Sequence, residues 1–254
     1  MRPLREPFFQ LSVSNYRVSD EAEAADEPKI EVRATADGSP TLYVPALNEH
    51  YHSTHGARQE SAHVFIEAGL RPLLAAGLGR QQPLRLLEVG LGTGLNALLT
   101  LDAAQAAGAS IGYDGYETQP LPPEAVAALR PQWQAEPAMQ AAFDQLHAAP
   151  WGGASPLATG FELSKVPQPL QAAALPAGCY HLIYFDAFAP DKQPELWAPE
   201  VFAQLYAAAA PGAVLVSYCA QGEFRRRLRA AGWLTERLPG PPGKREMTRA
   251  RKPA

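Results

Sequence analysis

A glycine-rich turn between a strand-like run and a helix-like run constrains the fold of this sequence most strongly. Residues 84–89 are apolar and β-prone, and residues 95–107 are rich in Ala and Leu over a helical length. Gly90, Gly92 and Gly94 lie between them in the spacing G-x-G-x-G. Glycine lets a backbone turn tightly and approach a ligand with no Cβ in the way. The pattern therefore predicts a strand–turn–helix unit with a ligand at the turn.

Strand-like and helix-like segments continue to alternate after this turn. The predicted strands are 84–89, 110–116, 161–165, 180–185, 213–218, 234–238 and 246–250. The predicted helices are 95–107, 123–129, 194–209 and 223–231. Such alternation is typical of an α/β, Rossmann-like fold: a mostly parallel sheet with helices on both faces and right-handed crossovers. A stretch rich in Pro and Gly before residue 161 gives no clear prediction.

The N-terminal part, residues 1–80, is predicted to be an extension packed on a main domain at 81–254. Within it, residues 12–28 are polar and acidic and favour a mobile loop. Residues 29–35 and 41–44 flank the turn sequence Ala-Asp-Gly-Ser and predict a β-hairpin. Residues 61–77 have helical spacing, with a break expected at Pro72.

Composition excludes a membrane span and a secretory signal, because no apolar stretch is long enough for either. Cys179 and Cys219 are expected as buried residues of a reduced, cytoplasmic protein, although one disulfide stays open. The net charge of −4 argues against a generally basic nucleic-acid binder. Residues 225–252, however, hold ten Lys or Arg against Glu236 and Glu246, a balance of +8. From charge alone, a face for a polyanion and a solvated helix surface are equally supported.

Acidic residues near the glycine turn indicate which cofactor it binds. Glu88, two residues before Gly90, would repel a pyrophosphate but could hold an ammonium group. S-adenosylmethionine carries such a group at its amino-acid end. Glu117 ends the second predicted strand, where an acid can accept hydrogen bonds from ribose hydroxyls. Strand, turn, helix and second-strand acid together predict an S-adenosylmethionine site, to which Asn96 and Thr118 also belong.

Asp186 follows the apolar run 182–185 and precedes the turn Ala-Phe-Ala-Pro. Ligands of open α/β sheets bind just past the carboxyl ends of strands, so a chemical role is favoured there. The alternative is an Asp that caps the next helix.

Three motifs resemble those of a known family. They are EVGLGTGLN at 88–96, DAFAPDKQPELW at 186–197 and GPPGKREM at 240–247. They are similar to the methyltransferase half of the bifunctional tRNA wobble-uridine enzyme MnmC and its stand-alone counterpart MnmD. Residues 48–66 and 224–233 match as well, and the likeness covers about 29–249. The first motif is generic, whereas the other two are specific to the family.

The resemblance implies a class I S-adenosylmethionine-dependent methyltransferase. It would methylate 5-aminomethyl-2-thiouridine in the tRNA anticodon and give the 5-methylaminomethyl form. Asp186 matches the carboxylate beside the substrate amine, and Tyr51 and Ser53 would lie in a lid near the methyl donor. The expected substrate and RNA residues are Phe188, Pro190, Lys192, Arg225, Arg226, Arg227, Lys244, Arg245 and Glu246. No flavin domain is recognised, so the oxidoreductase activity of MnmC is not expected.

Two features of the sequence do not follow from the resemblance, and two alternative functions stay open. The third strand lacks the family's acid near adenine, so Gln168 or backbone would have to bind the base. The spacing of His50, His52 and His55 invites a metal, but no metal is expected without a nearby Cys. A spermidine-synthase-like aminopropyltransferase would use the same sheet and a strand-four Asp. A non-catalytic RNA-binding module is the second alternative.

Overall fold

The structure is a computed structural model that describes residues 30–254. The predicted acidic loop at 12–28 lies outside the described residues, and the division at residue 80 stays a prediction. The strands are β1 Glu31–Ala34, β2 Pro40–Val44, β3 Glu49–His50, β4 Leu84–Val89, β5 Ile111–Tyr116, β6 Ala154–Ala158, β7 Phe161–Val166, β8 Tyr180–Phe185, β9 Ala209–Ser217, β10 Leu234–Pro239 and β11 Glu246–Arg251. The α-helices are α1 Ala57–Ser61, α2 Arg71–Ala75, α3 Leu95–Ala107, α4 Pro123–Leu129, α5 Pro137–Ala148, α6 Pro199–Ala208 and α7 Gly222–Ala230. A π-helical segment, η1 Ala62–Leu70, joins α1 to α2, and short 3-10 turns are η2 Arg130–Trp133, η3 Leu170–Ala172 and η4 Pro194–Trp197.

The main sheet has eight strands in the order β10-β11-β9-β8-β4-β5-β7-β6. The central strands β9, β8, β4, β5 and β7 run parallel. At one end β6 pairs antiparallel with β7, and at the other β11 pairs antiparallel with both β9 and the edge strand β10. The chain moves outward from β4 through β5 to β7, then returns to β8 on the other side of β4. The carboxyl ends of β4 and β8 thus form the topological switch point, where α/β folds bind ligands. The predicted α/β class is confirmed.

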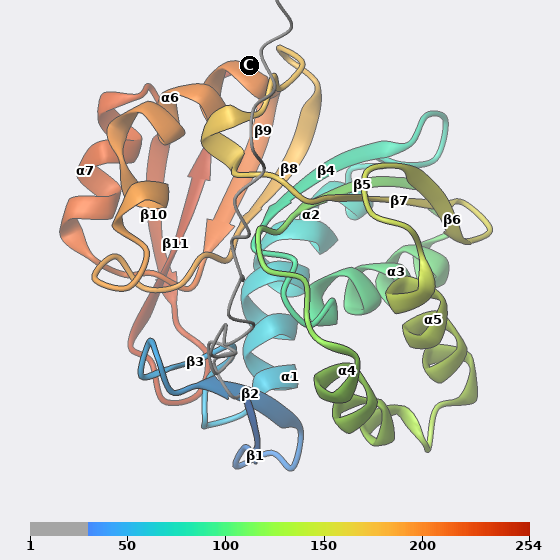
Figure 1. Cartoon of the computed structure of the whole chain (residues 1–254). Helices are drawn as coiled ribbons and strands as arrows, with labels where there is room; N and C mark the ends of the chain where they lie inside the picture. The colour runs from blue at the N-terminus through green and yellow to red at the C-terminus, as the bar shows by residue number, and fades with distance from the viewer. Residues whose placement is uncertain (1–29) are drawn as a thin grey trace, which may run out of the picture.

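Alternate residues of the central strands fill two apolar layers. Leu86 and Leu182 pack with the segment α1–η1–α2, α3 and α5, whereas Leu87 and Ile183 pack with α6 and α7. Figure 1 shows these helix groups on opposite sides of the sheet, with β1–β3 beside α1. Strands buried on both faces read as continuous apolar runs, which explains why they were predictable. No helix within residues 30–254 is long and apolar enough to cross a membrane.

The predicted break at Pro72 is wrong. The chain stays helical from α1 through η1 to α2, and Pro72 lies in the first turn of α2. Proline cannot donate the backbone hydrogen bond that the Ala68 carbonyl would receive in an α-helix. The Arg249 side chain donates to this carbonyl instead, with Nη1 3.3 Å from the oxygen. A contact from β11 therefore gives this carbonyl a side-chain donor.

Two elements were missed in the Pro- and Gly-rich stretch, and one predicted helix is divided. Helix α5 buries Met139, Phe143 and Leu146 at helical spacing, and β6 adds an antiparallel edge to β7. The predicted helix 194–209 is the turn η4 followed by α6. Ala198 between them is extended, with ψ 147°, because the residue before a proline disfavours the helical conformation. The hairpin is confirmed as β1–β2 and gains a third strand, β3.

Candidate functional site

A cavity of about 820 Å³ opens at the carboxyl ends of β4, β5 and β8. It is lined by the glycine turn, the segment after β3, the loop after β8 and the loop between β10 and β11. The predicted residues that line it are Tyr51, Ser53, Gly90, Gly92, Asn96, Glu117, Thr118, Asp186, Phe188 and Lys244. Residues scattered along the sequence thus come together at the switch point of the sheet.

Gly90 lets the glycine turn lie directly against the start of the loop after β8. Its φ is +87°, and a Cβ there would lie 2.6 Å from the Asp186 carbonyl oxygen. The Asp186 amide donates to the Val89 carbonyl at 3.0 Å. Gly94, the residue before α3, has φ +75°. The turn and Asp186 therefore form one surface of the cavity.

Glu117 lies where a ribose-binding acid was predicted. Its carboxylate lines the cavity and accepts hydrogen bonds from the Gly92 amide at 3.0 Å and the Gln119 amide at 2.8 Å. Burial raises its pKa. A carboxylate oriented by two backbone donors at the end of β5 fits the pair of hydroxyls of a ribose.

Asp186 directly follows β8 and is only partly exposed. Burial raises its pKa to about 7, against a lowering by the hydrogen bond from Asn96. Glu60 raises the pKa further, whereas Lys244 lowers it. The next helical segment starts only at Pro194, so Asp186 does not cap a helix. A carboxylate with a pKa near neutrality can accept a proton at physiological pH.

Glu88 does not lie where a residue that holds a cofactor ammonium was expected. It is fully buried beneath the turn and is not among the described residues that line the cavity. One carboxylate oxygen accepts from the Tyr113 hydroxyl at 2.7 Å, and the other accepts from Asn96 Nδ2 at 2.8 Å. Burial raises its pKa well above the usual value. This arrangement does not provide the direct contact with a cofactor ammonium that we expected.

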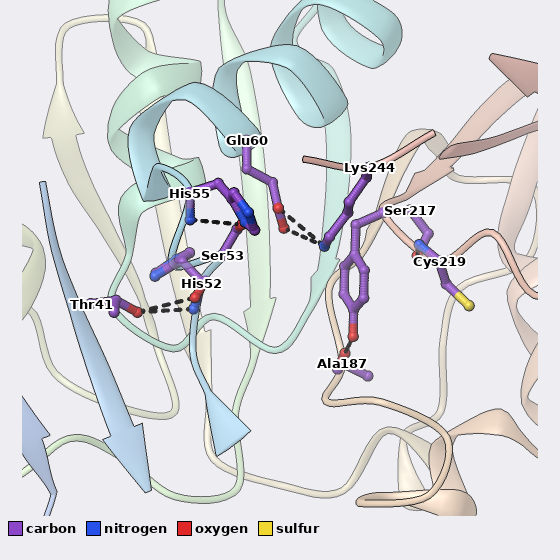
Figure 2. Close-up of polar contacts among 10 residues, drawn as sticks. Thr41, His52, Ser53, His55, Glu60, Ala187, Ser217, Cys219 and Lys244 are labelled. Carbon is purple, nitrogen blue, oxygen red and sulfur yellow. Dashed lines mark hydrogen bonds and ion pairs between the residues drawn. The ribbon is translucent and has the colours of Figure 1, made fainter. Parts of the chain in front are cut away.

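The segment after β3 forms one wall of the cavity, as predicted for a lid. The Tyr51 ring meets the Phe188 ring edge to face, with centroids 5.2 Å apart. Thr41 of β2 holds the segment: its hydroxyl accepts from the His52 amide at 3.1 Å and lies 3.4 Å from the His52 carbonyl oxygen (Figure 2). The hairpin thus fixes a wall that faces the loop after Asp186.

Glu60, Lys244 and Tyr218 form a second cluster beside Asp186. Lys244 Nζ lies 3.0 Å from a Glu60 carboxylate oxygen and 4.3 Å from the centroid of the Tyr218 ring. The Tyr218 hydroxyl donates to the carbonyl of Ala187 at 2.8 Å. Sequence reasoning missed Glu60 and Tyr218, although Glu60 lies within a segment that resembles the family. Lys244 was predicted to contact RNA phosphates, but its ammonium lies in the cavity.

The basic residues of the C-terminal part are mostly paired. Arg225 is buried and lies 3.2 Å from Glu246, so the predicted phosphate contact of Arg225 is wrong. Arg226 is exposed and paired with Glu223 at 2.7 Å, and Arg227 pairs with the same carboxylate. Arg245 is exposed, whereas Pro190 and Lys192 are half-buried in the loop after Asp186. A local balance of +8 therefore does not make a uniformly basic face.

Gln168, which we expected to contact adenine, lines the cavity together with Leu170. Both lie in the region where the family's acid is absent.

Within residues 30–254, no three His, Cys, Asp or Glu side chains are grouped to hold a metal. Burial lowers the pKa of His52 to about 4, so its imidazole is neutral at pH 7. Both cysteines are thiols, with Cys219 buried and Cys179 partly exposed.

Comparisons with known proteins agree with this geometry. The family described as S-adenosyl-L-methionine-dependent methyltransferase matches residues 168–253. The chain is 34% identical over 225 residues to the tRNA 5-methylaminomethyl-2-thiouridine biosynthesis bifunctional protein MnmC of Cupriavidus necator, covering 84% of this chain and 33% of that protein. MnmC of Chromohalobacter salexigens is 30% identical over 229 residues, covering 87% and 32%.

The chain is thus similar to S-adenosylmethionine-dependent methyltransferases over residues 168–253 and is related to MnmC. It spans about a third of the length of these MnmC relatives. MnmC2 of Aquifex aeolicus has the same fold, with a TM-score of 0.71 and 22% identity over 91% of this chain and 74% of that one. The predicted class I methyltransferase fold and cofactor are thereby confirmed. The turn with three glycines of positive φ and the oriented Glu117 carboxylate fit S-adenosylmethionine.

Proposed function

We propose that this methyltransferase acts on the aminomethyl group of 5-aminomethyl-(2-thio)uridine at the tRNA wobble position and gives the 5-methylaminomethyl form. The charge of the cavity carries this proposal. Among the described residues that line it, Glu49, Glu60, Glu117, Asp186 and Glu195 are acids, and Lys244 is the only lysine or arginine. Such a cavity favours a cationic sulfonium donor and a primary alkylammonium acceptor.

Asp186 performs the central step. S-adenosylmethionine, when bound, supplies an electrophilic methyl group. Asp186 accepts the proton of the substrate ammonium and orients the nitrogen, whose lone pair forms the new N–C bond as the S–C bond breaks. The electron pair of that bond goes to sulfur, and the proton passes from Asp186 to water. A carboxyl with a pKa of about 7 is far better matched to this transfer than an ordinary aspartate.

The choice of tRNA rests on the relatives and on one aromatic side chain. The MnmC relatives are named for the biosynthesis of 5-methylaminomethyl-2-thiouridine. Phe188 lines the cavity two residues after Asp186, where a splayed-out base could stack on its ring. We place the enzyme in the cytoplasm, with its tRNA substrate.

A transfer assay tests the proposal. The protein is mixed with S-adenosylmethionine labelled in the methyl group and with tRNA that carries 5-aminomethyl-2-thiouridine. We expect label in the wobble nucleoside after digestion. A parallel reaction with decarboxylated S-adenosylmethionine and putrescine tests for an aminopropyltransferase. No label in tRNA, despite intact cofactor binding, would contradict the proposal, and tRNA binding alone would favour the non-catalytic module.

A further inference from the structure

We infer that Asn96, held in place by Glu88 and Tyr113, is a positioning residue that fixes the Asp186 carboxylate for the incoming amine. The inference rests on the proposed function of Asp186. It assigns Glu88 a structural partner in place of the cofactor contact expected from the sequence. The three residues come from α3, β4 and β5 and link the interior of the sheet to the reacting end of the cavity.

The Asn96 amide lies between two carboxylates. Its Nδ2 atom is 2.8 Å from Glu88 Oε1 and 2.8 Å from Asp186 Oδ2, and the residue is 3% exposed. The oxygens of Glu88 and Asp186 are hydrogen-bond acceptors, so the group of Asn96 that faces both must be the NH₂ donor. The amide oxygen of Asn96, itself an acceptor, would be repelled there. The amide orientation follows from this chemistry.

The position of Asn96 determines what remains available on Asp186. With Oδ2 engaged by the amide, Oδ1 is the oxygen left for the substrate nitrogen. Asn96 lies in the first turn of α3, directly after the glycine turn. Any shift of the turn against β8 would therefore rotate Asp186, so the amide ties the cofactor turn to the carboxylate that aims the amine.

The unpartnered oxygen of Asn96 indicates that this arrangement is not optimised for stability. Asn96 Oδ1 is buried and has no hydrogen-bond partner among residues 30–254. An unsatisfied buried acceptor destabilises a fold, and an apolar side chain at this position would avoid that cost. The amide is best explained by what its nitrogen does for Asp186.

Glu88 of β4 and Tyr113 of β5 fix the Asn96 amide from the interior of the protein. The Tyr113 hydroxyl donates to Glu88 Oε2 at 2.7 Å, and both side chains are buried. Burial and the nearby Asp186 charge raise the pKa of Glu88 well above its usual value, against the hydrogen bonds from Tyr113 and Asn96. These two hydrogen bonds fix Glu88, and Glu88 in turn fixes Asn96 beside Asp186.

Other groups face Asp186 from different elements. Glu60 of α1 and Lys244 of the β10–β11 loop act on it by charge, and Tyr218 after β9 holds the neighbouring Ala187 carbonyl. Asn96 donates the one side-chain hydrogen bond that the described residues make to the Asp186 carboxylate. Its effect on Asp186 is thus separable from theirs by substitution.

Asn96→Ala tests the inference, with Thr100→Val as the matched control. Thr100 is buried on the same helix and lies 3.1 Å from the Tyr184 hydroxyl, so Thr100→Val also removes a buried hydrogen bond. We expect Asn96→Ala to lower kcat at least about tenfold, since small misplacements of a catalytic group have large kinetic effects. The KM for S-adenosylmethionine should change less than kcat, because the proposed effect of Asn96 is on the position of Asp186. Thr100→Val should change neither.

The titration of Asp186 provides a readout that needs no substrate. In protein labelled with ¹³C at aspartate carboxyls, the Asp186 resonance should titrate at higher pH in Asn96→Ala, because the amide hydrogen bond lowers its pKa. Thr100→Val should leave the midpoint in place. An unchanged midpoint and kcat in Asn96→Ala would overturn the inference.

Glu88→Gln separates the two roles considered for Glu88. Glutamine can still accept from Asn96, so we expect kcat to fall less than in Asn96→Ala and cofactor affinity by calorimetry to stay within about twofold. A loss of affinity above about tenfold would make Glu88 a cofactor ligand and refute the inference. If wild-type protein methylates no tRNA, the proposed function fails, whereas the carboxyl titration still decides the role of Asn96.

Discussion

The carboxylates of the cavity and those of the C-terminal hairpin have opposite environments. Burial raises the pKa of Asp186 and Glu117, which line the cavity, and of Glu88 beneath it. On the β10–β11 hairpin, Arg249 and Arg251 lie 2.6 Å and 2.9 Å from Glu236, and their hydrogen bonds and charges lower its pKa despite partial burial. Burial dominates the pKa of the acids in the first region, whereas pairing with arginines dominates in the second.

This contrast separates residues that serve chemistry from residues that serve the fold. A carboxylate with a raised pKa destabilises the native state when it ionises, and a carboxylate with a lowered pKa stabilises it. Strongly perturbed acids in a cleft are therefore candidates for function, as at Asp186. The hairpin acids hold strands together. Each of the following predictions tests one side of this difference.

The largest effect is expected at Asp186. Asp186→Asn keeps the shape of the side chain but cannot accept the proton, so transfer to tRNA should fall by roughly 10²–10⁴-fold. Binding of S-adenosylmethionine, measured by calorimetry, should persist. Glu236→Gln, the matched change on the hairpin, should leave turnover unaltered. Turnover retained in Asp186→Asn would remove this residue from the mechanism.

The same substitution should stabilise the fold at high pH. The unfolded carboxyl ionises near its usual pKa of 3.8, whereas the folded one ionises at about 7, so stability falls as pH rises between these values. At pH 8 we expect Asp186→Asn to raise the free energy of unfolding by on the order of 1–3 kcal/mol, allowing for solvent screening. At pH 3 the gain should vanish. Urea titrations at both pH values measure it.

Lys244→Met should have a smaller effect on activity, through charge. Lys244 lowers the pKa of Asp186, so its removal raises that pKa and shifts the rising limb of the pH–rate profile to higher pH. At pH 7 we expect a loss of roughly 2–5-fold, corresponding to an increase of about 0.5–1 pKa unit. Glu60→Gln should shift the limb the other way, because Glu60 raises the pKa. A shift of the limb in the same direction in both variants would contradict the opposite charge effects assigned to Lys244 and Glu60.

The smallest effect is expected on the hairpin. Glu236→Gln removes a partly exposed ion-pair partner and should cost about 0.2–1 kcal/mol of unfolding free energy at pH 7. Because the pKa of Glu236 is lowered in the fold, the difference should disappear as pH falls through that folded pKa. Thermal denaturation at pH 7 and pH 3 checks this. A loss of methyl transfer in this variant would erase the contrast between the regions.

Some of the site could be predicted from single segments of sequence. The glycine turn, Glu117 and Asp186 each follow a buried strand, and parallel strands end at one edge of a sheet. Their meeting therefore followed from the alternation of strands and helices. The missed helix α5 had apolar residues at helical spacing, but the prolines around it concealed the pattern.

The sequence did not predict which charged residues of the C-terminal part are buried or paired. The balance of +8 over residues 225–252 did not reveal that Arg225 lies buried against Glu246 or that Lys244 pairs with Glu60. The partner of Lys244 is distant in the chain, and no local pattern encodes such a pair. Likewise, the position of Glu88 before the glycines indicated a ligand contact, whereas alternation along β4 points its side chain to Tyr113 and Asn96.

The sequence by itself determined the α/β fold, the cofactor turn and the carboxylate at the end of β8, because hydrophobic periodicity and glycine spacing act locally. Only the tertiary structure decided how that carboxylate is used. The burial that raises the Asp186 pKa, the Asn96 amide that orients it and the opposing charges of Glu60 and Lys244 come from different elements. Desolvation and Coulomb forces depend on distance in space, and that distance exists only once the sheet has brought these elements together.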